Sequence, residues 1–248
     1  MHTGARVTLA TMNLAPKALS LDLDDTLWPI WPVIERAEAA LEAFLRERCP
    51  RTAERYPIAL MRQLREQVAV EHPQYAHDFT RQRKLSLAQA LRNSGDDEAH
   101  VDDAFDAFYS ARNRIDFYPD ALAALDRLAA RWPIAALTNG NADLERIGIA
   151  DRFTVFVAAR EAGHAKPDAP IFHATCARLG LAPHEVLHIG DDPLLDVAGA
   201  SWAGLRTCWI NRRNEQWPLR LPAPDLQFTT LDALADWLDA QHPATEHA

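Results

Sequence analysis

The chain has 248 residues, of which 48% are hydrophobic and 25% are charged, and its formal net charge is −9. These proportions are ordinary for a soluble globular protein, and the length suits one main domain with an insertion. The acidic total argues against nonspecific nucleic-acid binding, which needs Lys and Arg to neutralise phosphates, but it leaves a small anionic substrate open.

The first half of the chain is expected to contain one strand and a run of helices. Residues 1–16 have the pattern of a loose leader, and the apolar run at 18–23 predicts a buried strand. Apolar residues at helical spacing then mark four segments: 33–45, ended by Pro50; 58–68, ended by Pro73; 79–93, ended by Ser94-Gly95; and 101–108. Residues 29–116 are therefore predicted to be helical, with no strand.

The second half alternates between short apolar strands and helices. Strands are predicted at 133–138, 153–158, 185–189 and 205–210, and helices at 122–128, 168–179, 194–203 and 229–241, with a Pro-rich surface loop at 218–224. Such alternation is typical of a parallel sheet with helices on both faces. We therefore predict an α/β fold: a Rossmann-like three-layer α/β/α core (1–28 and 117–248) with an all-helical domain (29–116) inserted after the first strand.

Chemically active residues follow four of the predicted strands. They are Asp22 and Asp24 after the first strand, Thr138 and Asn139 at the end of the second, Lys166 beyond the third, and Asp191 with Asp196 beyond the fourth. Ligands of open parallel sheets bind at the carboxyl ends of the strands, so we expect these groups to share one rim.

This set of side chains suits a metal ion and a phosphoryl group. Clustered carboxylates suit Mg²⁺, and Lys, Thr and Asn suit phosphoryl oxygens. An ionised carboxylate can also attack phosphorus. Asp22 and Asp24 are two residues apart, so at a strand end they point the same way; one could attack while the other transfers a proton.

Four segments resemble, in this order, the motifs of the haloacid dehalogenase (HAD) superfamily: DLDDTLW, LTNGN, EAGHAKPDAPIF and HIGDDPLLDVAGA. The resemblance spans residues 18–210. It implies that Asp22 is the nucleophile and Asp24 the general acid/base. Thr138 and Asn139 would bind the phosphoryl group, and Lys166 would hold both phosphate and nucleophile.

The resemblance also implies a metal site and a cap. Asp22, the backbone carbonyl of Asp24 and Asp191 would bind Mg²⁺, and Asp196 would orient metal-bound water or Lys166. The helical insert at 29–116 would be the family's cap, which closes over the site and selects the substrate.

The second aspartate favours one reaction within the superfamily. Dehalogenases lack this acid/base residue, because a halide leaves without a proton. Asp24 therefore favours a Mg²⁺-dependent phosphomonoesterase that forms an aspartyl-phosphate. A 2-haloacid dehalogenase, a phosphomutase and a HAD-scaffold protein without catalysis remain alternatives.

A narrower resemblance concerns the substrate. The segments RWPIAALTNGNADLERIGIADRF and HDFTRQRKLSLAQAL are similar to the bacterial YigB-type phosphatases. These act on 5-amino-6-(5-phosphoribitylamino)uracil in riboflavin synthesis and on flavin mononucleotide (FMN). The resemblance implies a small phosphorylated metabolite as the partner.

Several residues near the motifs have competing interpretations. Asp25 and Asp192 are expected to cap turns or loops rather than to bind metal, and His164 and His188 to be loop or core residues. Trp28 could stack on a base or flavin ring or pack at the point where the insert begins. The basic residues of the insert are open between contacts with an anionic substrate and a solvated surface; they are Arg81, Arg83, Lys84, Arg112 and Arg114.

The remaining features indicate a reduced cytoplasmic protein. Cys49, Cys176 and Cys208 are far apart and match neither a disulfide framework nor a zinc site. The first 17 residues lack the apolar stretch of a signal peptide, and no run approaches the roughly 20 residues of a membrane helix. We expect a soluble monomer or homodimer that binds neither membrane nor nucleic acid.

Overall fold

The computed structural model describes residues 6–7 and 15–241, and the chain divides into two compact units. The core unit comprises the residues up to Trp28, Phe117–Asn139 and the residues from Gly148 onward. The helical unit comprises Pro29–Asp116 and Gly140–Ile147. The sequence-based division did not place Gly140–Ile147 with the helices, to which it is tied by a 2.8 Å hydrogen bond from Asp143 N to Asn113 Oδ1. The assignment of the helical unit as a cap domain stays a prediction.

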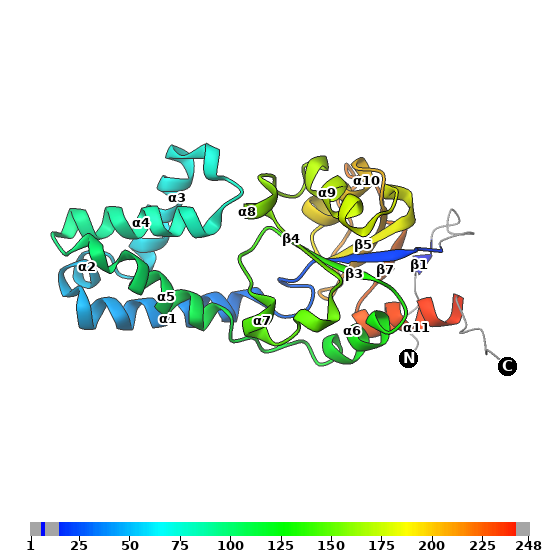
Figure 1. Ribbon diagram of the computed structural model, residues 1–248, viewed down its shortest axis with the longest axis horizontal. Helices are drawn as coiled ribbons and strands as arrows, with labels where there is room; N and C mark the ends of the chain where they lie inside the picture. The colour runs from blue at the N-terminus through cyan, green and yellow to red at the C-terminus, as the bar shows by residue number, and fades with distance from the viewer. Residues whose placement is uncertain (1–5, 8–14, 242–248) are drawn as a thin grey trace. The chain divides into compact units, whose positions relative to one another are not determined.

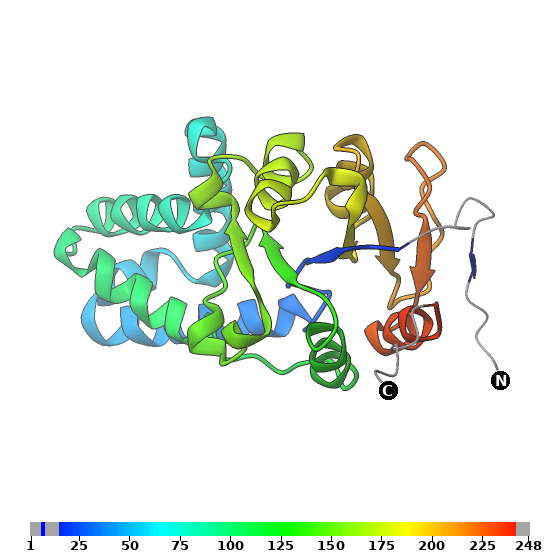
Figure 2. The same cartoon turned by 45° about the vertical axis from the view of Figure 1, so that its right-hand side comes forward.

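The core unit is built on a sheet that has seven strands among the described residues, in the order β1-β7-β6-β5-β2-β3-β4 (Figures 1 and 2). The strands are β1 (Arg6–Val7), β2 (Ala18–Leu21), β3 (Ile134–Thr138), β4 (Val155–Ala158), β5 (Val186–Gly190), β6 (Arg206–Ile210) and β7 (Leu226–Phe228). Strands β2 to β7 are parallel, and β1 pairs antiparallel with β7. Strand β2 lies between β3 and β5, which places its end at the middle of the rim.

Helices cover both faces of this sheet. They are α6 (Ala121–Ala129), α8 (Ala159–Ala162), α9 (Ala169–Leu179), α10 (Gly199–Trp202) and α11 (Leu231–Gln241), with a π-helix at Pro193–Ala198. Figures 1 and 2 show α9 and α10 over one face and α6 and α11 over the other. All residues of β2, β3 and β5 are buried, as expected for strands covered on two sides. The predicted α/β fold is confirmed.

The sequence missed the shortest elements and one change of helix type. Strands β1 and β7 have two and three residues, too few to show a period. The rest of the predicted leader, residues 1–5 and 8–14, lies outside the described residues, as does most of the segment tested for a signal peptide. The helix predicted at 194–203 is a π-helix followed by the short α10.

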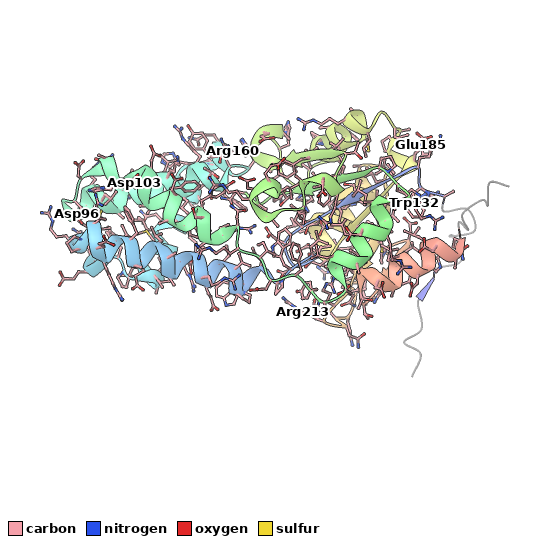
Figure 3. All side chains as sticks on the ribbon, turned by 60° about the horizontal axis from the view of Figure 1, so that its bottom comes forward. Asp96, Asp103, Trp132, Arg160, Glu185 and Arg213 are labelled. Carbon is pink, nitrogen blue, oxygen red and sulfur yellow. The ribbon has the colours of Figure 1, made fainter. Side chains whose placement is uncertain are left out.

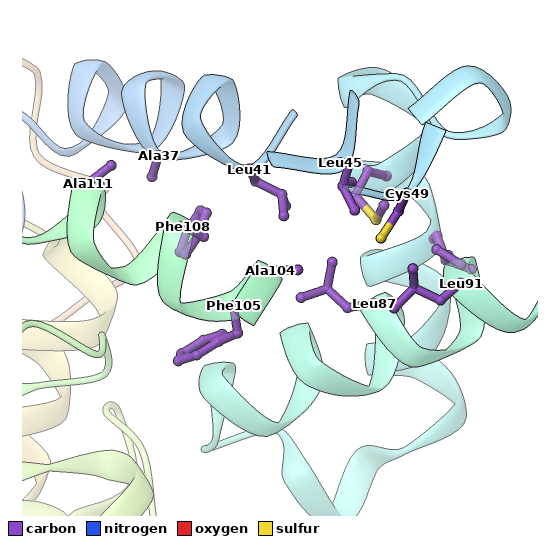
Figure 4. Packing of buried hydrophobic residues seen from close by; sticks show 13 residues of the cluster. Ala37, Leu41, Leu45, Cys49, Leu87, Leu91, Ala104, Phe105, Phe108 and Ala111 are labelled. Atoms are coloured by element: carbon purple, nitrogen blue, oxygen red, sulfur yellow. The ribbon is translucent and has the colours of Figure 1, made fainter. Parts of the chain in front are cut away.

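The helical unit packs four longer helices around its own apolar core. Its helices are α1 (Ile30–Arg48), α2 (Pro50–Arg55), α3 (Ile58–Glu71), α4 (Phe79–Ser94), α5 (Val101–Arg112) and α7 (Leu144–Ile147). Figure 4 shows Leu41 of α1, Leu87 of α4 and Phe108 of α5 among the buried residues of this cluster. Gly95, at φ 75°, ends α4 in the left-handed conformation that glycine adopts without strain.

Pro50 has a second role that the sequence did not predict. Helix α1 ends before it, at Arg48, but Pro50 is also the first residue of α2. Proline suits a first helical position because its missing N–H has no partner there. No helix among residues 6–7 and 15–241 is long and apolar enough to cross a membrane.

Candidate active site

Asp22 directly follows β2 and is buried at the rim of the sheet. Its backbone N–H donates to Ile189 O of β5 at 2.9 Å, which continues the strand pairing by one residue. Its two carboxylate oxygens have different partners. Oδ1 accepts from Lys166 Nζ at 2.5 Å, and Oδ2 accepts from Thr26 Oγ1 at 3.2 Å. The nucleophile expected from the sequence is thus held from both sides.

Lys166 is fixed in place by Asn139. The Asn139 side chain donates to Lys166 O at 2.9 Å and accepts from Lys166 N at 2.8 Å. Asn139 follows Thr138, the buried last residue of β3, so this pair of bonds anchors the lysine loop to the same rim. The side-chain amide of Asn139 therefore contacts the lysine main chain, and its part in phosphoryl binding stays a prediction.

Asp196 holds the other side of the Lys166 ammonium. Its Oδ1 accepts from Lys166 Nζ at 2.6 Å and lies 3.2 Å from His188 Nε2, and its Oδ2 accepts from Asp192 N at 3.0 Å. Gly190 makes this approach of Asp196 to β5 feasible, because a Cβ at residue 190 would lie 2.3 Å from Asp196 Cγ. Asp196 thus contacts the Lys166 ammonium directly, and its role in orienting that lysine during a reaction stays a prediction.

Asp191 completes a group of three carboxylates. One oxygen each of Asp22, Asp191 and Asp196 lie within 4.8 Å of one another. Thr26 links two of them, since its hydroxyl lies 3.2 Å from Asp22 Oδ2 and 3.2 Å from Asp191 Oδ1. A hydroxyl carries one hydrogen, so Thr26 donates to one of these oxygens at a time.

The protonation of the group follows from burial and charge. Burial raises the pKa of Asp22 to about 7, against the opposing charge of Lys166. Burial, with Asp196 and Asp22 nearby, raises the pKa of Asp191 to about 9. Burial also opposes the charge on Asp196, but Lys166 and His188 hold the pKa of that carboxyl below its usual range. Asp196 and Asp22 in turn raise the pKa of Lys166 despite its burial, so the ammonium stays charged.

This donor set fits a hard divalent cation. The buried carboxylates Asp22 and Asp196 and the partly buried Asp191 lie together. Lys166 is the cation that contacts two of them, Asp22 and Asp196. Carboxylate oxygens are the ligands that Mg²⁺ and Ca²⁺ prefer. Asp22 and Asp191, which Thr26 links, would bind such an ion directly, and Asp196 would hold Lys166 beside it.

Asp24 lies apart from the lysine network. Its Oδ1 accepts from the indole N–H of Trp28 at 2.8 Å. The turn between them closes by a bond from Asp25 N to Trp28 O at 2.7 Å, and Asp25 has φ 61°. Asp25 is thus a turn residue, as predicted. The Asp24 carboxylate is held by Trp28.

The structure decides between several of the competing interpretations. Trp28 is 0% exposed, so it packs in the core unit and its faces are closed to a stacked base. Asp192 caps the π-helix by accepting from Leu194 N and Leu195 N, both at 2.7 Å. His164 is an exposed loop residue, and His188 is a core residue as predicted, although its bond to Asp196 was not foreseen.

The five basic residues of the helical unit differ in their surroundings, and a role in substrate binding stays a hypothesis for them. Arg83 is buried with its guanidinium 3.5 Å from the centre of the Phe108 ring. Lys84 pairs with Asp102 at 2.8 Å, Arg81 is exposed, and Arg112 is buried. Arg114 is exposed, and its backbone carbonyl accepts from Arg36 Nη2 at 2.5 Å.

Sequence reasoning missed two residues that support the site. Thr26 stands within the first motif, four residues after Asp22, and that spacing was its only signal. Arg212 follows β6 and donates to Thr26 O at 2.8 Å and to Asp120 Oδ1 at 2.9 Å. Nothing in the sequence connects these three residues, which come from separate parts of the core unit.

Asp191 also borders a polar cavity of the core unit. Asp25, Tyr118, Arg213 and Glu215 contribute to its lining. Figure 3 labels Arg213, whose side chain is largely exposed. Part of the Asp191 surroundings is therefore an open, polar cavity rather than packed core.

The sequence and the fold match known proteins over most of the chain. Residues 16–204 match the family of haloacid dehalogenase-like hydrolases. The 5-amino-6-(5-phospho-D-ribitylamino)uracil phosphatase YigB of Escherichia coli K12 is 34% identical over 225 residues, 88% of this chain and 94% of that relative. A phosphoserine phosphatase of Thermus thermophilus is 35% identical over 136 residues, 52% of this chain and 55% of that relative.

A solved structure is similar across both units. The crystal structure of 2-haloacid dehalogenase from Pseudomonas syringae pv. Tomato DC3000 has a TM-score of 0.83 and 32% sequence identity. The similarity covers 91% of this chain and 99% of that one. These matches confirm the resemblance seen in the four motifs and in the two longer segments.

Proposed function

The chain belongs to the haloacid dehalogenase-like hydrolases, and on that premise we propose that it hydrolyses phosphate monoesters through an aspartyl-phosphate on Asp22. The observation that carries this proposal is the second carboxylate, Asp24, which is held by Trp28 outside the Lys166 network. An alkoxide leaving group needs a proton, and a halide does not. A separately held acid beside the nucleophile therefore suits an ester.

In the first step, an Asp22 oxygen attacks phosphorus and forms a P–O bond. The bond from phosphorus to the ester oxygen breaks, and that oxygen takes a proton from Asp24. Lys166, 2.5 Å from Asp22 Oδ1, favours the ionised form of the nucleophile and neutralises phosphoryl charge. Thr138 and Asn139, at the end of β3, would bind the phosphoryl group. Asn139 also holds the loop of Lys166 through its bond to Lys166 O.

In the second step, Asp24 takes a proton from water, and the oxygen of that water attacks phosphorus. The bond between phosphorus and Asp22 breaks, which restores the carboxylate and releases inorganic phosphate. Mg²⁺ bound by Asp22, Asp191 and the Asp24 carbonyl would supply further neutralisation of phosphoryl charge. Asp196 would keep Lys166 aligned throughout, since it accepts from the same ammonium.

The proposed substrate is a small phosphorylated metabolite. The YigB relative, named for 5-amino-6-(5-phospho-D-ribitylamino)uracil, covers 88% of this chain and supports that compound, or FMN, as the first choice. We assign substrate selection to the helical unit, which is inserted directly after the turn that holds Asp24.

The test is phosphate release from a panel of esters in the presence of Mg²⁺. The panel contains the ribitylaminouracil phosphate, FMN, sugar phosphates, nucleotides and phosphoserine. We expect release by the wild-type protein and at least about a 1,000-fold loss in Asp22→Asn, with an unchanged circular dichroism spectrum. Substantial activity in Asp22→Asn would exclude Asp22 as the nucleophile.

A 2-haloacid dehalogenase is the second candidate, and the solved structure at 32% identity favours it. That reaction would release halide from 2-chloropropionate without any need for Asp24. Halide release that survives both EDTA and Asp24→Asn, together with no phosphate release from the panel, would replace the phosphatase proposal.

A further inference from the structure

The Asp24 side chain accepts a hydrogen bond from Trp28, whose own side chain is completely buried. The indole nitrogen lies 2.8 Å from Asp24 Oδ1. An indole N–H donates and cannot accept, so Trp28 can orient this carboxyl group but cannot exchange protons with it. The contact can therefore affect the orientation of the Asp24 carboxyl group.

The position of the indole ring is set by the core unit. Phe117 packs edge-on against it, with ring centres 5.6 Å apart and an interplanar angle of 83°. The main chain on both sides is also tied, by bonds from Asp25 N to Trp28 O at 2.7 Å and from Tyr118 N to Leu27 O at 2.9 Å. The ring has no room to turn, because a fully buried side chain is surrounded by close-packed atoms.

These contacts join the two points where the chain leaves and re-enters the core unit. Trp28 is the last core residue before the helical unit, and Phe117 is the first after it. The acid/base side chain is thus oriented by the pair of residues that frame the insertion. Any buried indole N–H needs an acceptor. What is particular here is that the acceptor is the side chain of Asp24, the proposed acid/base residue.

We propose that Trp28 is a positioning residue that aims the Asp24 carboxyl group at the leaving oxygen of the substrate. This proposal rests on the proposed function, because it needs Asp24 to be the proton donor. Fixing one carboxyl oxygen to the indole N–H directs the proton-bearing part of the group toward a defined place. Loss of that bond should weaken proton donation while leaving attack by Asp22 intact.

The test compares two leaving groups in Trp28→Phe, which keeps an aromatic ring and removes the N–H. One substrate is p-nitrophenyl phosphate, whose leaving group departs without a proton. The other is the best alkyl ester among FMN, glucose 6-phosphate and glycerol 3-phosphate. The readout is kcat/KM, which reports the steps up to departure of the leaving group.

We expect Trp28→Phe to lower kcat/KM for the alkyl ester by about tenfold or more, and for p-nitrophenyl phosphate by less than about threefold. Asp24→Asn should show the same selectivity with a larger loss, since general acid catalysis contributes about 10²–10⁴-fold. Trp132→Phe is the matched control, because it removes a buried indole N–H that donates to Pro16 O at 3.1 Å. Trp132 is labelled in Figure 3. This variant should keep the wild-type kcat/KM on both substrates.

Equal losses on both substrates in a folded Trp28→Phe protein, or no loss on either, would overturn the positioning role alone. A wild-type protein that cleaves p-nitrophenyl phosphate but no alkyl ester would also overturn it, because the proton donation by Asp24 would be missing. A wild-type protein that cleaves neither would overturn the proposed function itself.

Discussion

Lys166 donates to Asp22 across 144 positions of sequence, and its ammonium nitrogen lies 2.5 Å from Asp22 Oδ1. The side chains are 3% and 8% exposed, so this ion pair is withdrawn from water. The same ammonium contacts Asp196 at 2.6 Å. One lysine therefore compensates two buried carboxylates, and its loss would leave both without a cation.

Lys166→Met should be destabilising and inactive. Removing one partner of a buried ion pair costs about 3–5 kcal/mol, because the remaining charge stays buried. We expect a loss of that order in the free energy of unfolding and at least about a 100-fold fall in kcat. Lys17→Met is the control: Lys17 also pairs at 2.5 Å, with Glu185, but its side chain is 65% exposed and its removal should change stability little. Similar losses in both variants would contradict the role of burial.

Metal removal should be visible without any substrate. Asp22 and Asp191 are expected to bind Mg²⁺ only in the folded state, so saturating Mg²⁺ should raise Tm and EDTA should reverse the rise. At a concentration about 100 times Kd, the stabilisation is about 2.7 kcal/mol. Asp191→Asn should lose this response, whereas Asp192→Asn, a helix-capping variant, should keep it. A Tm that is indifferent to Mg²⁺ in the wild-type protein would contradict the metal site.

A simple rule of sheet geometry was enough to group candidate site residues from the sequence. Parallel strands end at a common rim, so Asp22, Thr138 and Asp191 could be grouped from their places after apolar runs. The rule does not predict which side chains of the rim form hydrogen bonds with one another. The bonds of Trp28 to Asp24 and of His188 to Asp196 depend on those directions, and the sequence therefore left both residues ambiguous.

Gly190→Ala should lower activity by displacing Asp196, which contacts Lys166. A Cβ there would lie 2.3 Å from Asp196 Cγ, closer than any tolerated contact, so Asp196 would move and Lys166 would lose a partner. We expect at least about a tenfold fall in kcat and a lower Tm. Gly180→Ala is a control for a loss of stability that does not involve Asp196. Gly180 has φ 70° and no heavy atom within 4 Å of its added Cβ, so alanine there should lower Tm through backbone strain without affecting kcat. Unchanged kcat in Gly190→Ala would show that Asp196 can relax.

Protonation of Asp120 should contribute to the loss of folding stability at low pH. Burial opposes ionisation of this carboxyl, but hydrogen bonds from Arg212 and Leu231 N hold its pKa below the usual value. A folded-state pKa below the unfolded one means that the stabilisation is complete above about pH 4 and is lost as the pH falls through the folded-state pKa. Asp120→Asn should therefore cost about 1–2 kcal/mol at pH 7, and its deficit relative to wild type should shrink below about pH 4. A deficit that is constant with pH in urea unfolding would exclude this charge as the cause.

Arg83 and Arg81, two residues apart on α4, should respond differently to truncation. The sequence left both open between contact with an anionic substrate and a solvated surface, but Arg83 is 6% exposed and stacks on Phe108. Arg83→Ala removes the buried side-chain stem as well as the stacked guanidinium, so we expect about 2–4 kcal/mol of destabilisation in urea unfolding. Arg81, exposed and 5.3 Å from the Tyr75 ring, should be nearly neutral in stability when changed to Ala. If Arg83 instead served the substrate, Arg83→Ala would raise KM for the phosphate ester with little change in stability, and the rise would depend on ionic strength. Helix α4 would then contribute binding charge rather than packing at this position.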